Sequence, residues 1–175
     1  MPRRVPPAPP IFTFRVRLPD FVDEDGTKVD EVWREIEVAA NQTLADLGEA
    51  IPLAFGFTDP HLWSFFLSGK AWDRHSQYAL DSSPGPFGEP GPRAARRVLI
   101  GAVPFPGVRG TKEFLFLFDY GDEWHFRVKL VRTSDTLLPD AAYPRVTAQY
   151  GKAPPQYEGM EDEDEEEEDD DADAD

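Results

Sequence analysis

Alternation of apolar and polar residues predicts two strands near the start of the chain. In residues 11–18 (IFTFRVRL) large apolar side chains alternate with threonine and arginine, a period of two that is typical of a strand with one buried face. Residues 31–38 (EVWREIEV) predict a second strand, and Asp25-Gly26 between the two is a turn signal. Because Trp33 interrupts the second alternation, we expect a bulge there or burial on both faces.

A helical pattern follows the two strands. Apolar residues recur at spacings of three and four within residues 44–55, and Asn41 or Thr43 can cap the start of an amphipathic helix. Pro52 conflicts with this pattern because proline inside a helix removes a hydrogen bond and costs about 3 kcal/mol. We therefore expect a kink near Gly48 or an early end.

Further strands are expected in the rest of the chain, the clearest of them in a hairpin. Residues 61–68 (HLWSFFLS) and 77–80 predict a third and a short fourth strand. Residues 113–118 (EFLFLF) are apolar on both faces apart from the first, whereas residues 124–130 alternate. The turn residues 119–122 (DYGD) join these two runs, so the hairpin has a central and a half-exposed strand.

Three segments have weaker signals. Residues 81–95 are rich in proline and glycine and predict a mobile insertion, residues 96–103 form an apolar element of undefined type, and residues 139–157 are expected to wrap the surface. The pattern as a whole predicts a single α+β domain over residues 11–157. Its sheet is expected to be mostly antiparallel, with a β-grasp-like N-terminal half and a C-terminal β-hairpin.

Charge divides the chain into two parts. The 175 residues hold 18 Lys and Arg against 34 Asp and Glu, a formal net charge of −16. Residues 158–175 alone hold 14 carboxylates and no Lys or Arg, which leaves 20 acids against 18 bases before them. We therefore expect a near-neutral folded body, a disordered acidic tail over 158–175 and a disordered leader over 1–10.

Composition also excludes several classes of chemistry and location. The chain has no cysteine, so disulfides, thiolate metal sites and cysteine nucleophiles are excluded. No window approaches the roughly 18 apolar residues of a membrane span, and proline interrupts the apolar stretches near the start. A soluble cytoplasmic protein that makes no membrane contact is the simplest expectation.

Several short blocks along the chain resemble one protein family. The blocks are VWR at 32–34, TLADL at 43–47, AFGF at 54–57, HLWSF at 61–65, YPR at 143–145 and, most specific of all, FDYGDEW at 118–124. Together they resemble the plasmid pRi ORF-three-like family, whose members often carry the label transposon-passenger TnpR-type protein. The resemblance covers roughly residues 11–157 and implies an uncharacterised bacterial protein associated with mobile elements.

The chain departs from this family in ways that matter for metal binding and recombination. Phe126 stands where relatives often have histidine, and Ala153 and Glu158 stand where many have cysteine, so any metal bound by those groups in relatives is not expected here. A serine recombinase needs a nucleophilic serine among arginines, and the six serines lie in strand, turn or loop contexts. The TnpR label is therefore interpreted as genetic context, and the sequence favours no enzymatic activity.

The residues with candidate chemistry each have a plainer structural explanation. Asp119, Asp122 and His125 could bind a divalent metal, but aspartate and glycine in a turn serve the backbone equally well. A carboxylate pair of Asp119 and Glu123 lacks an identifiable pocket. His61 is expected to cap the backbone or to stabilise the 119–124 turn.

The sequence thus predicts binding without catalysis. The candidate binding residues, all in family blocks, are Trp33, His61, Asp119, Tyr120, Gly121, Asp122, Trp124 and Arg145. We expect a non-catalytic interaction module, without cofactor, that binds a peptide or protein through an exposed sheet edge or an aromatic groove. Two alternatives remain: a nucleic-acid-associated accessory factor, whose basic strand faces the acidic tail would cover, and a metal-dependent hydrolase.

Overall fold

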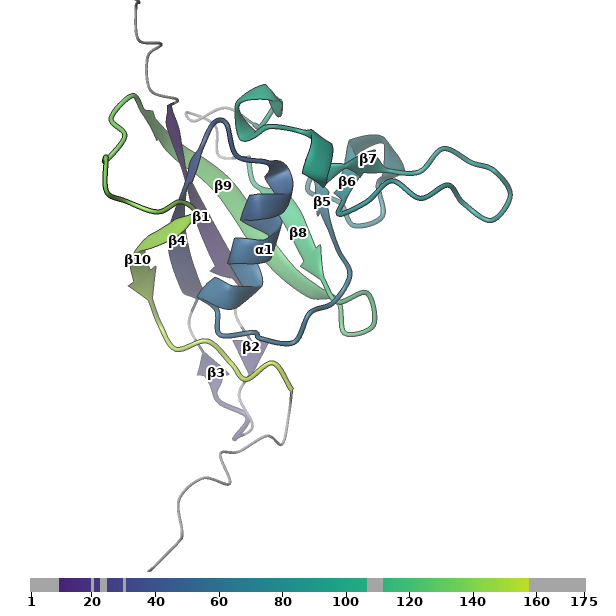
Figure 1. Ribbon diagram of the computed structural model, residues 1–175. Helices are drawn as coiled ribbons and strands as arrows, with labels where there is room; N and C mark the ends of the chain where they lie inside the picture. Colours follow the sequence, from purple (N-terminus) through teal and green to yellow (C-terminus); the bar gives the residue numbers. More distant parts are fainter. Residues whose placement is uncertain (1–9, 20, 23–24, 30, 107–111, 158–175) are drawn as a thin grey trace, which may run out of the picture.

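A computed structural model describes residues 10–19, 21–22, 25–29, 31–106 and 112–157. Within them, eight strands form one open sheet in the order β10-β4-β1-β9-β8-β5-β6-β7, and β2 (Phe21–Val22) pairs with β3 (Lys28–Val29) beside it (Figure 1). Neighbouring strands of the sheet are antiparallel except for β6 and β7. The predicted mostly antiparallel sheet is confirmed. The leader, apart from residue 10, and the acidic tail lie outside the described residues.

The main sheet and the helices that accompany it have the following bounds. The strands are β1 (Ile11–Leu18), β4 (Val32–Ala39), β5 (Trp63–Phe66), β6 (Gln77–Ala79), β7 (Arg93–Ala94), β8 (Phe114–Phe118), β9 (Trp124–Ser134) and β10 (Arg145–Tyr150). The helix α1 (Leu44–Ala54) lies against one face of the sheet (Figure 1). Single 3₁₀ turns are η1 (Arg74–Ser76), η2 (Ala95–Arg97) and η3 (Ile100–Ala102). No helix in these described segments is both long and apolar enough to cross a bilayer.

The start of α1 is fixed by a capping box. The Thr43 hydroxyl accepts from the backbone N–H of Asp46, and the Asp46 carboxylate accepts from the backbone N–H of Thr43. The expected early end is wrong, because the helix continues through Pro52 to Ala54. Pro52 lies in the last turn, where it removes only the bond to the Gly48 carbonyl, and burial of the apolar stripe of α1 outweighs that loss.

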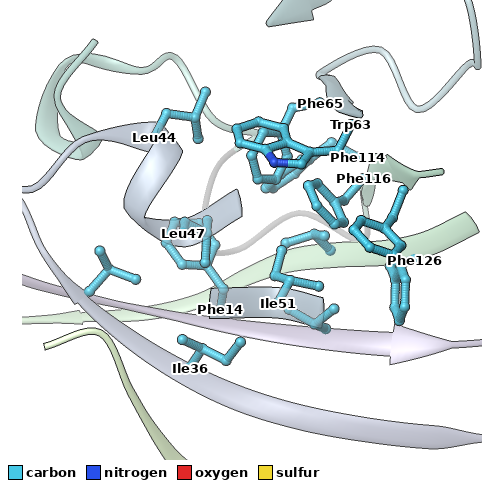
Figure 2. Close-up of a cluster of buried hydrophobic side chains, with 14 of the residues drawn as sticks. Phe14, Ile36, Leu44, Leu47, Ile51, Trp63, Phe65, Phe114, Phe116 and Phe126 are labelled. Atoms are coloured by element: carbon cyan, nitrogen blue, oxygen red, sulfur yellow. The ribbon is translucent and has the colours of Figure 1, made fainter. Parts of the chain in front are cut away.

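Aromatic side chains from the sheet and the apolar stripe of α1 form the core. Figure 2 shows Leu47 and Ile51 of the helix among rings from several strands. The rings of Phe65 and Phe116 have centroids 4.7 Å apart, and those of Phe116 and Phe126 are 6.1 Å apart. The sheet therefore buries one face against α1, and its opposite face does not pack against the helix.

The register and burial of β4 decide between the two alternatives expected at Trp33. Residues of β4 pair with β1 without a shift, so this pair contains no bulge at Trp33. Instead, Trp33 points to the face away from α1 and Arg34 points toward the helix. The irregularity lies in β10, between Val146 and Ala148. Burial on both faces, the other expected alternative, is confirmed, because the adjacent residues Arg34 and Glu35 are each 7% exposed. The apolar alternation is interrupted because a charged residue, Arg34, occupies a core position.

The three segments with weak sequence signals contain more regular structure than expected. Residues 93–94 of the predicted mobile insertion form β7, and residues 145–150, predicted only to wrap the surface, form the edge strand β10. The apolar element at 96–103 forms η2 and η3. An edge strand exposes most of its side chains, so residues such as those of β10 carry no apolar alternation to predict them.

Candidate functional site

The family block 118–124 forms the turn between β8 and β9. Asp119 and Glu123 adopt positive φ angles of 59° and 52°, which non-glycine residues seldom do. Oδ1 of Asp119 accepts hydrogen bonds from the backbone N–H groups of Gly121 and Asp122, at 2.9 and 3.4 Å. These predicted site residues thus shape the turn itself.

His61 connects this turn to the last described residue of the chain. Its Nδ1 lies 3.3 Å from Oδ2 of Asp119, and its Nε2 lies 2.7 Å from the hydroxyl of Tyr157. The His61 ring also packs edge-on against Phe118. Asp119, His61 and Tyr157 therefore form a continuous polar chain, which we call the His61 chain.

The environment of Tyr157 favours the protonated form of its hydroxyl. Burial, followed by the nearby carboxylates of Asp59, Asp119 and Asp122, raises the pKa of the Tyr157 phenol above its ordinary value. A neutral phenol can donate or accept a hydrogen bond but is a poor nucleophile. The His61 chain is therefore suited to fastening the segment that ends at Tyr157.

Two further contacts fasten the same segment. Gln156 accepts from the backbone N–H of Asp59 and donates to the Asp59 carbonyl, both at 3.0 Å. Ala153 packs against the main core. No local sequence pattern predicts the Gln156 contacts, because they join residues almost a hundred positions apart and depend on the folded chain.

The aromatic residues of the family block point to opposite faces of the sheet. Trp124 packs on the α1 side, where the centroids of its ring and the Phe57 ring are 4.9 Å apart. Its buried indole N–H has no partner among the described residues. Tyr120 lies on the other side, where its hydroxyl is 2.6 Å from Oγ of Ser64 and its ring contacts Trp72. The block therefore does not gather its side chains into one cleft.

The candidate metal ligands are also dispersed. Nε2 of His125 lies 3.7 Å from the Glu123 carboxylate, while the carboxylate of Asp119 faces the turn and His61. Across the described ranges, no group of three His, Asp or Glu side chains is placed to hold a metal ion. Asp119, Asp122 and His125 remain explained by turn geometry and strand position.

Trp33 and Arg145 belong to a second region, on the face of the sheet away from α1. Residues directly opposite each other on paired strands share a face. Three rows of paired residues cross β10, β4, β1 and β9, and we call them together the charged face: Arg145-Glu37-Thr13-Arg132, then Glu35-Arg15-Lys129, then Tyr150-Trp33-Arg17-Arg127.

Each carboxylate of β4 on the charged face contacts two guanidinium groups. Glu35 lies 2.7 Å from Arg15 and 3.4 Å from Arg132. Glu37 lies 2.8 Å from Arg145 and 3.8 Å from Arg132. The acids of this face are thus already neutralised by their neighbours.

Cations remain in excess on the same face. Arg17 binds the Glu113 carboxylate through two hydrogen bonds of 2.6 and 2.7 Å, and Arg127 donates to the Gly69 carbonyl. Lys129 forms no salt bridge within the described parts of the chain, although its charge helps to lower the pKa of the nearby Glu113 carboxyl. Glu31 also lies 3.6 Å from Arg17. The side chains of the rows together with Glu31 and Glu113 comprise six cations against four carboxylates, so the face is positive on a near-neutral body.

An aromatic stack borders the charged face. The Arg15 guanidinium lies 4.4 Å from the Trp33 ring centroid, and Tyr150 stacks on Trp33 with centroids 6.2 Å apart and an interplanar angle of 18°. Tyr150 is 54% exposed. The charged face therefore combines cations with one accessible aromatic ring at the edge strand.

Arg34 is a buried charge that the sequence analysis did not single out. It is 7% exposed, and its guanidinium donates to the carbonyls of Trp33, Ala54, Tyr150 and Gly151. Burial lowers the pKa of this guanidinium, although it remains charged. Its place between apolar residues of β4 was the available signal for a buried arginine that joins α1 to β10.

The architecture and its surface chemistry place the chain in a class: open, mostly antiparallel sheet proteins with a single covering helix. Residues 12–167 match the family described as plasmid pRiA4b ORF-3-like protein, and the chain belongs to this family. The predicted family membership is confirmed.

Two relatives extend this comparison. The chain is 31% identical over 129 residues to the uncharacterized protein y4hQ of Sinorhizobium fredii, covering 73% of this chain and 59% of that protein. The chain thus spans well under two thirds of that relative. The crystal structure of MM3350, a protein of unknown function from Methanosarcina mazei Go1, shares the fold with a TM-score of 0.63 at 20% identity, over 85% of this chain and 74% of that chain.

Proposed function

We propose that the chain is a non-catalytic interaction module that binds a protein partner on its charged face. The observation that carries the proposal is the surplus of cations around Lys129 on a sheet face that α1 does not cover. A mixed charged rim with an exposed aromatic residue suits protein recognition. The association with bacterial mobile elements, the β-grasp-like N-terminal half and the cytoplasmic location are part of this proposal.

The sheet edges support binding on a face in preference to strand addition. In β10, Thr147 has no partner on β4, because the register shifts between Val146 and Ala148. The other edge strand, β7, has only two residues. A bulge and a short strand both discourage pairing with another chain, so of the two predicted binding modes the edge is the weaker.

A pull-down with matched charge reversals tests the proposed surface. Lys129→Glu reverses a cation of the charged face that forms no salt bridge with any described residue, and Arg97→Glu reverses an exposed cation in η2 away from it. We expect recovery of the partner with the unchanged chain and with Arg97→Glu, and at least a tenfold loss with Lys129→Glu. Equal recovery with all three proteins would remove the charged face from the proposal.

Nucleic acid is the second candidate partner, and the stack of Arg15, Trp33 and Tyr150 favours it. Single strands bind sheets through stacked aromatic rings and neighbouring cations. A labelled single-stranded oligonucleotide, followed by fluorescence anisotropy, should then bind with steep salt dependence and lose affinity in Tyr150→Ala. Absence of binding at low salt eliminates this candidate.

The metal-dependent hydrolase has the least support of the three. Its predicted ligands Asp119, Asp122 and His125 do not converge, as described above. Elemental analysis of the purified full chain would revive it only if a stoichiometric divalent metal were lost in Asp119→Asn.

A further inference from the structure

The charged face and residues 158–175 have opposite charge within one chain. Those residues contain 14 carboxylates and no Lys or Arg, whereas the charged face has a surplus of cations that includes Lys129. We propose that residues 158–175 bind the charged face of their own chain and are displaced by the partner. The inference rests on the proposed function, because it concerns regulation of the same surface.

Spacing on β9 matches that of a run of acids. Arg127 and Lys129 are two residues apart on one strand, so their side chains emerge on the same side about 7 Å apart. In an extended run of consecutive Asp and Glu, alternate carboxylates have the same separation. A continuous acidic segment can therefore place successive carboxylates against successive cations of β9.

The anchoring of Tyr157 brings the acidic segment within reach. Tyr157 immediately precedes the segment and is held by His61 at the turn that leads into β9. Eighteen residues can extend up to about 60 Å, at roughly 3.3 Å each. A segment tethered to its target by a short flexible linker acts at an effective concentration in the millimolar range.

The ion pairs between residues 158–175 and the charged face are expected to be weak enough for a partner to displace them. Exposed ion pairs are individually weak and are screened by salt. The screening length falls from about 10 Å at 0.1 M to about 3 Å at 1 M ionic strength. Binding within the chain should therefore exist at low salt and disappear at high salt, and a partner with better contacts can replace it.

Paramagnetic relaxation on the full chain tests this proposal. The chain has no cysteine, so Ala172→Cys offers a single site for a nitroxide label. At low salt we expect at least a twofold loss of intensity for the amides of Arg127 and Lys129. Leu53, which is 64% exposed on α1, should be unaffected. The loss should disappear in 1 M NaCl and shrink in Lys129→Glu, but persist in Arg97→Glu.

Two outcomes would overturn the proposal. Uniform or absent broadening would show that the segment does not prefer this face. Broadening that transfers to unlabelled, isotope-enriched chains in a mixture would assign the contact to a second copy. The partner pull-down remains a separate test. If replacing the 14 carboxylates by amides leaves partner recovery unchanged while Lys129→Glu still abolishes it, the regulation fails and the proposed function stands.

Discussion

At the scale of the residue, Arg34 is unusual because it is a charged side chain that is buried in the core. It satisfies carbonyls from the end of α1 and from the end of β10, and thereby substitutes for the basic residue that the last turn of α1 lacks. Buried backbone carbonyls that lose such a donor are costly. The arginine therefore acts as the link between the helix and the edge strand.

Arg34→Met should lower the free energy of unfolding by about 2–4 kcal/mol, because it keeps most of the volume but abandons the buried carbonyls. Urea unfolding measures the loss, and hydrogen exchange should show faster exchange around Tyr150. The exposed Arg97→Met is the control and should change stability by less than about 0.5 kcal/mol. A loss for Arg34→Met as small as that of the control would contradict this account.

At Gly48, helix propensity and core packing have opposite effects on stability when the residue is replaced by alanine. Alanine is favoured over glycine in a helix interior by about 1 kcal/mol. A Cβ atom at Gly48, however, would lie 2.5 Å from Cη2 of the buried Trp63 ring. Because forcing extra volume into a packed core costs about 1–3 kcal/mol, we expect Gly48→Ala to destabilise the chain by about 1 kcal/mol.

A double-mutant cycle separates the two effects of this substitution. In the background of Trp63→Leu the clash is relieved, so Gly48→Ala should become neutral or stabilising there. Thermal unfolding of the four proteins provides the comparison. Equal destabilisation in both backgrounds would show that Trp63 is not the cause.

At the scale of the element, the sequence predicted regular structure wherever burial imposes a period. The strand at 11–18, the cap at Thr43 and the hairpin around 119–122 follow from alternation, capping chemistry and turn residues. The strand β10 could not be predicted, because its neighbour β4 lies over a hundred residues earlier and the edge position leaves its side chains exposed.

The candidate site was predicted in part. The turn residues around Asp119 and the neighbourhood of His61 were indicated by the family block, and the structure brings these two together. Their partner Tyr157 carried no local signal, since its position depends on how the segment after β10 returns across the sheet. The sequence also did not predict that Trp33 and Arg145 lie apart from this turn, because only strand pairing decides which face of the sheet they share.

The pair of Arg17 and Glu113 should make part of the stability depend on pH. Hydrogen bonds from Arg17, opposed by burial and aided by nearby cations, hold the pKa of the Glu113 carboxyl below its usual value. A carboxyl with a lowered folded pKa stabilises the fold above its unfolded pKa of about 4.3, and the contribution is lost as pH falls through the folded pKa.

Glu113→Gln should therefore be less stable than the unchanged chain at pH 7 by about 0.5–1.5 kcal/mol, with the difference shrinking below about pH 4. Urea unfolding at pH 7, 5 and 3.5 follows this change. Glu49→Gln on the exposed side of α1 is the control, and its stability should stay close to that of the unchanged chain at each of these pH values. A difference for Glu113→Gln that is independent of pH would exclude the ionised carboxylate as its source.

At the scale of the whole molecule, the face away from α1 is divided between two kinds of surface. Over β5 and β8 the apolar residues Phe66, Leu115 and Leu117 are covered by Ala71 and Tyr120. Over β1, β4, β9 and β10 the same face of the sheet carries the rows of charge instead. Apolar packing thus occupies one half of this face, and the proposed binding surface occupies the other half.

The sequence separations of the paired strands predict an order of folding. The hairpin of β8 and β9 closes a five-residue turn, whereas β10 pairs with β4 across a separation of more than a hundred residues, and long loops cost more entropy to close. We expect Phe116→Leu in the hairpin to slow folding, with a φ-value above about 0.5, and Tyr150→Ala in β10 mainly to speed unfolding, with a φ-value below about 0.3. Stopped-flow chevron plots measure both. Slower folding in Tyr150→Ala at an unchanged unfolding rate would place the edge strand in the nucleus and reverse this order.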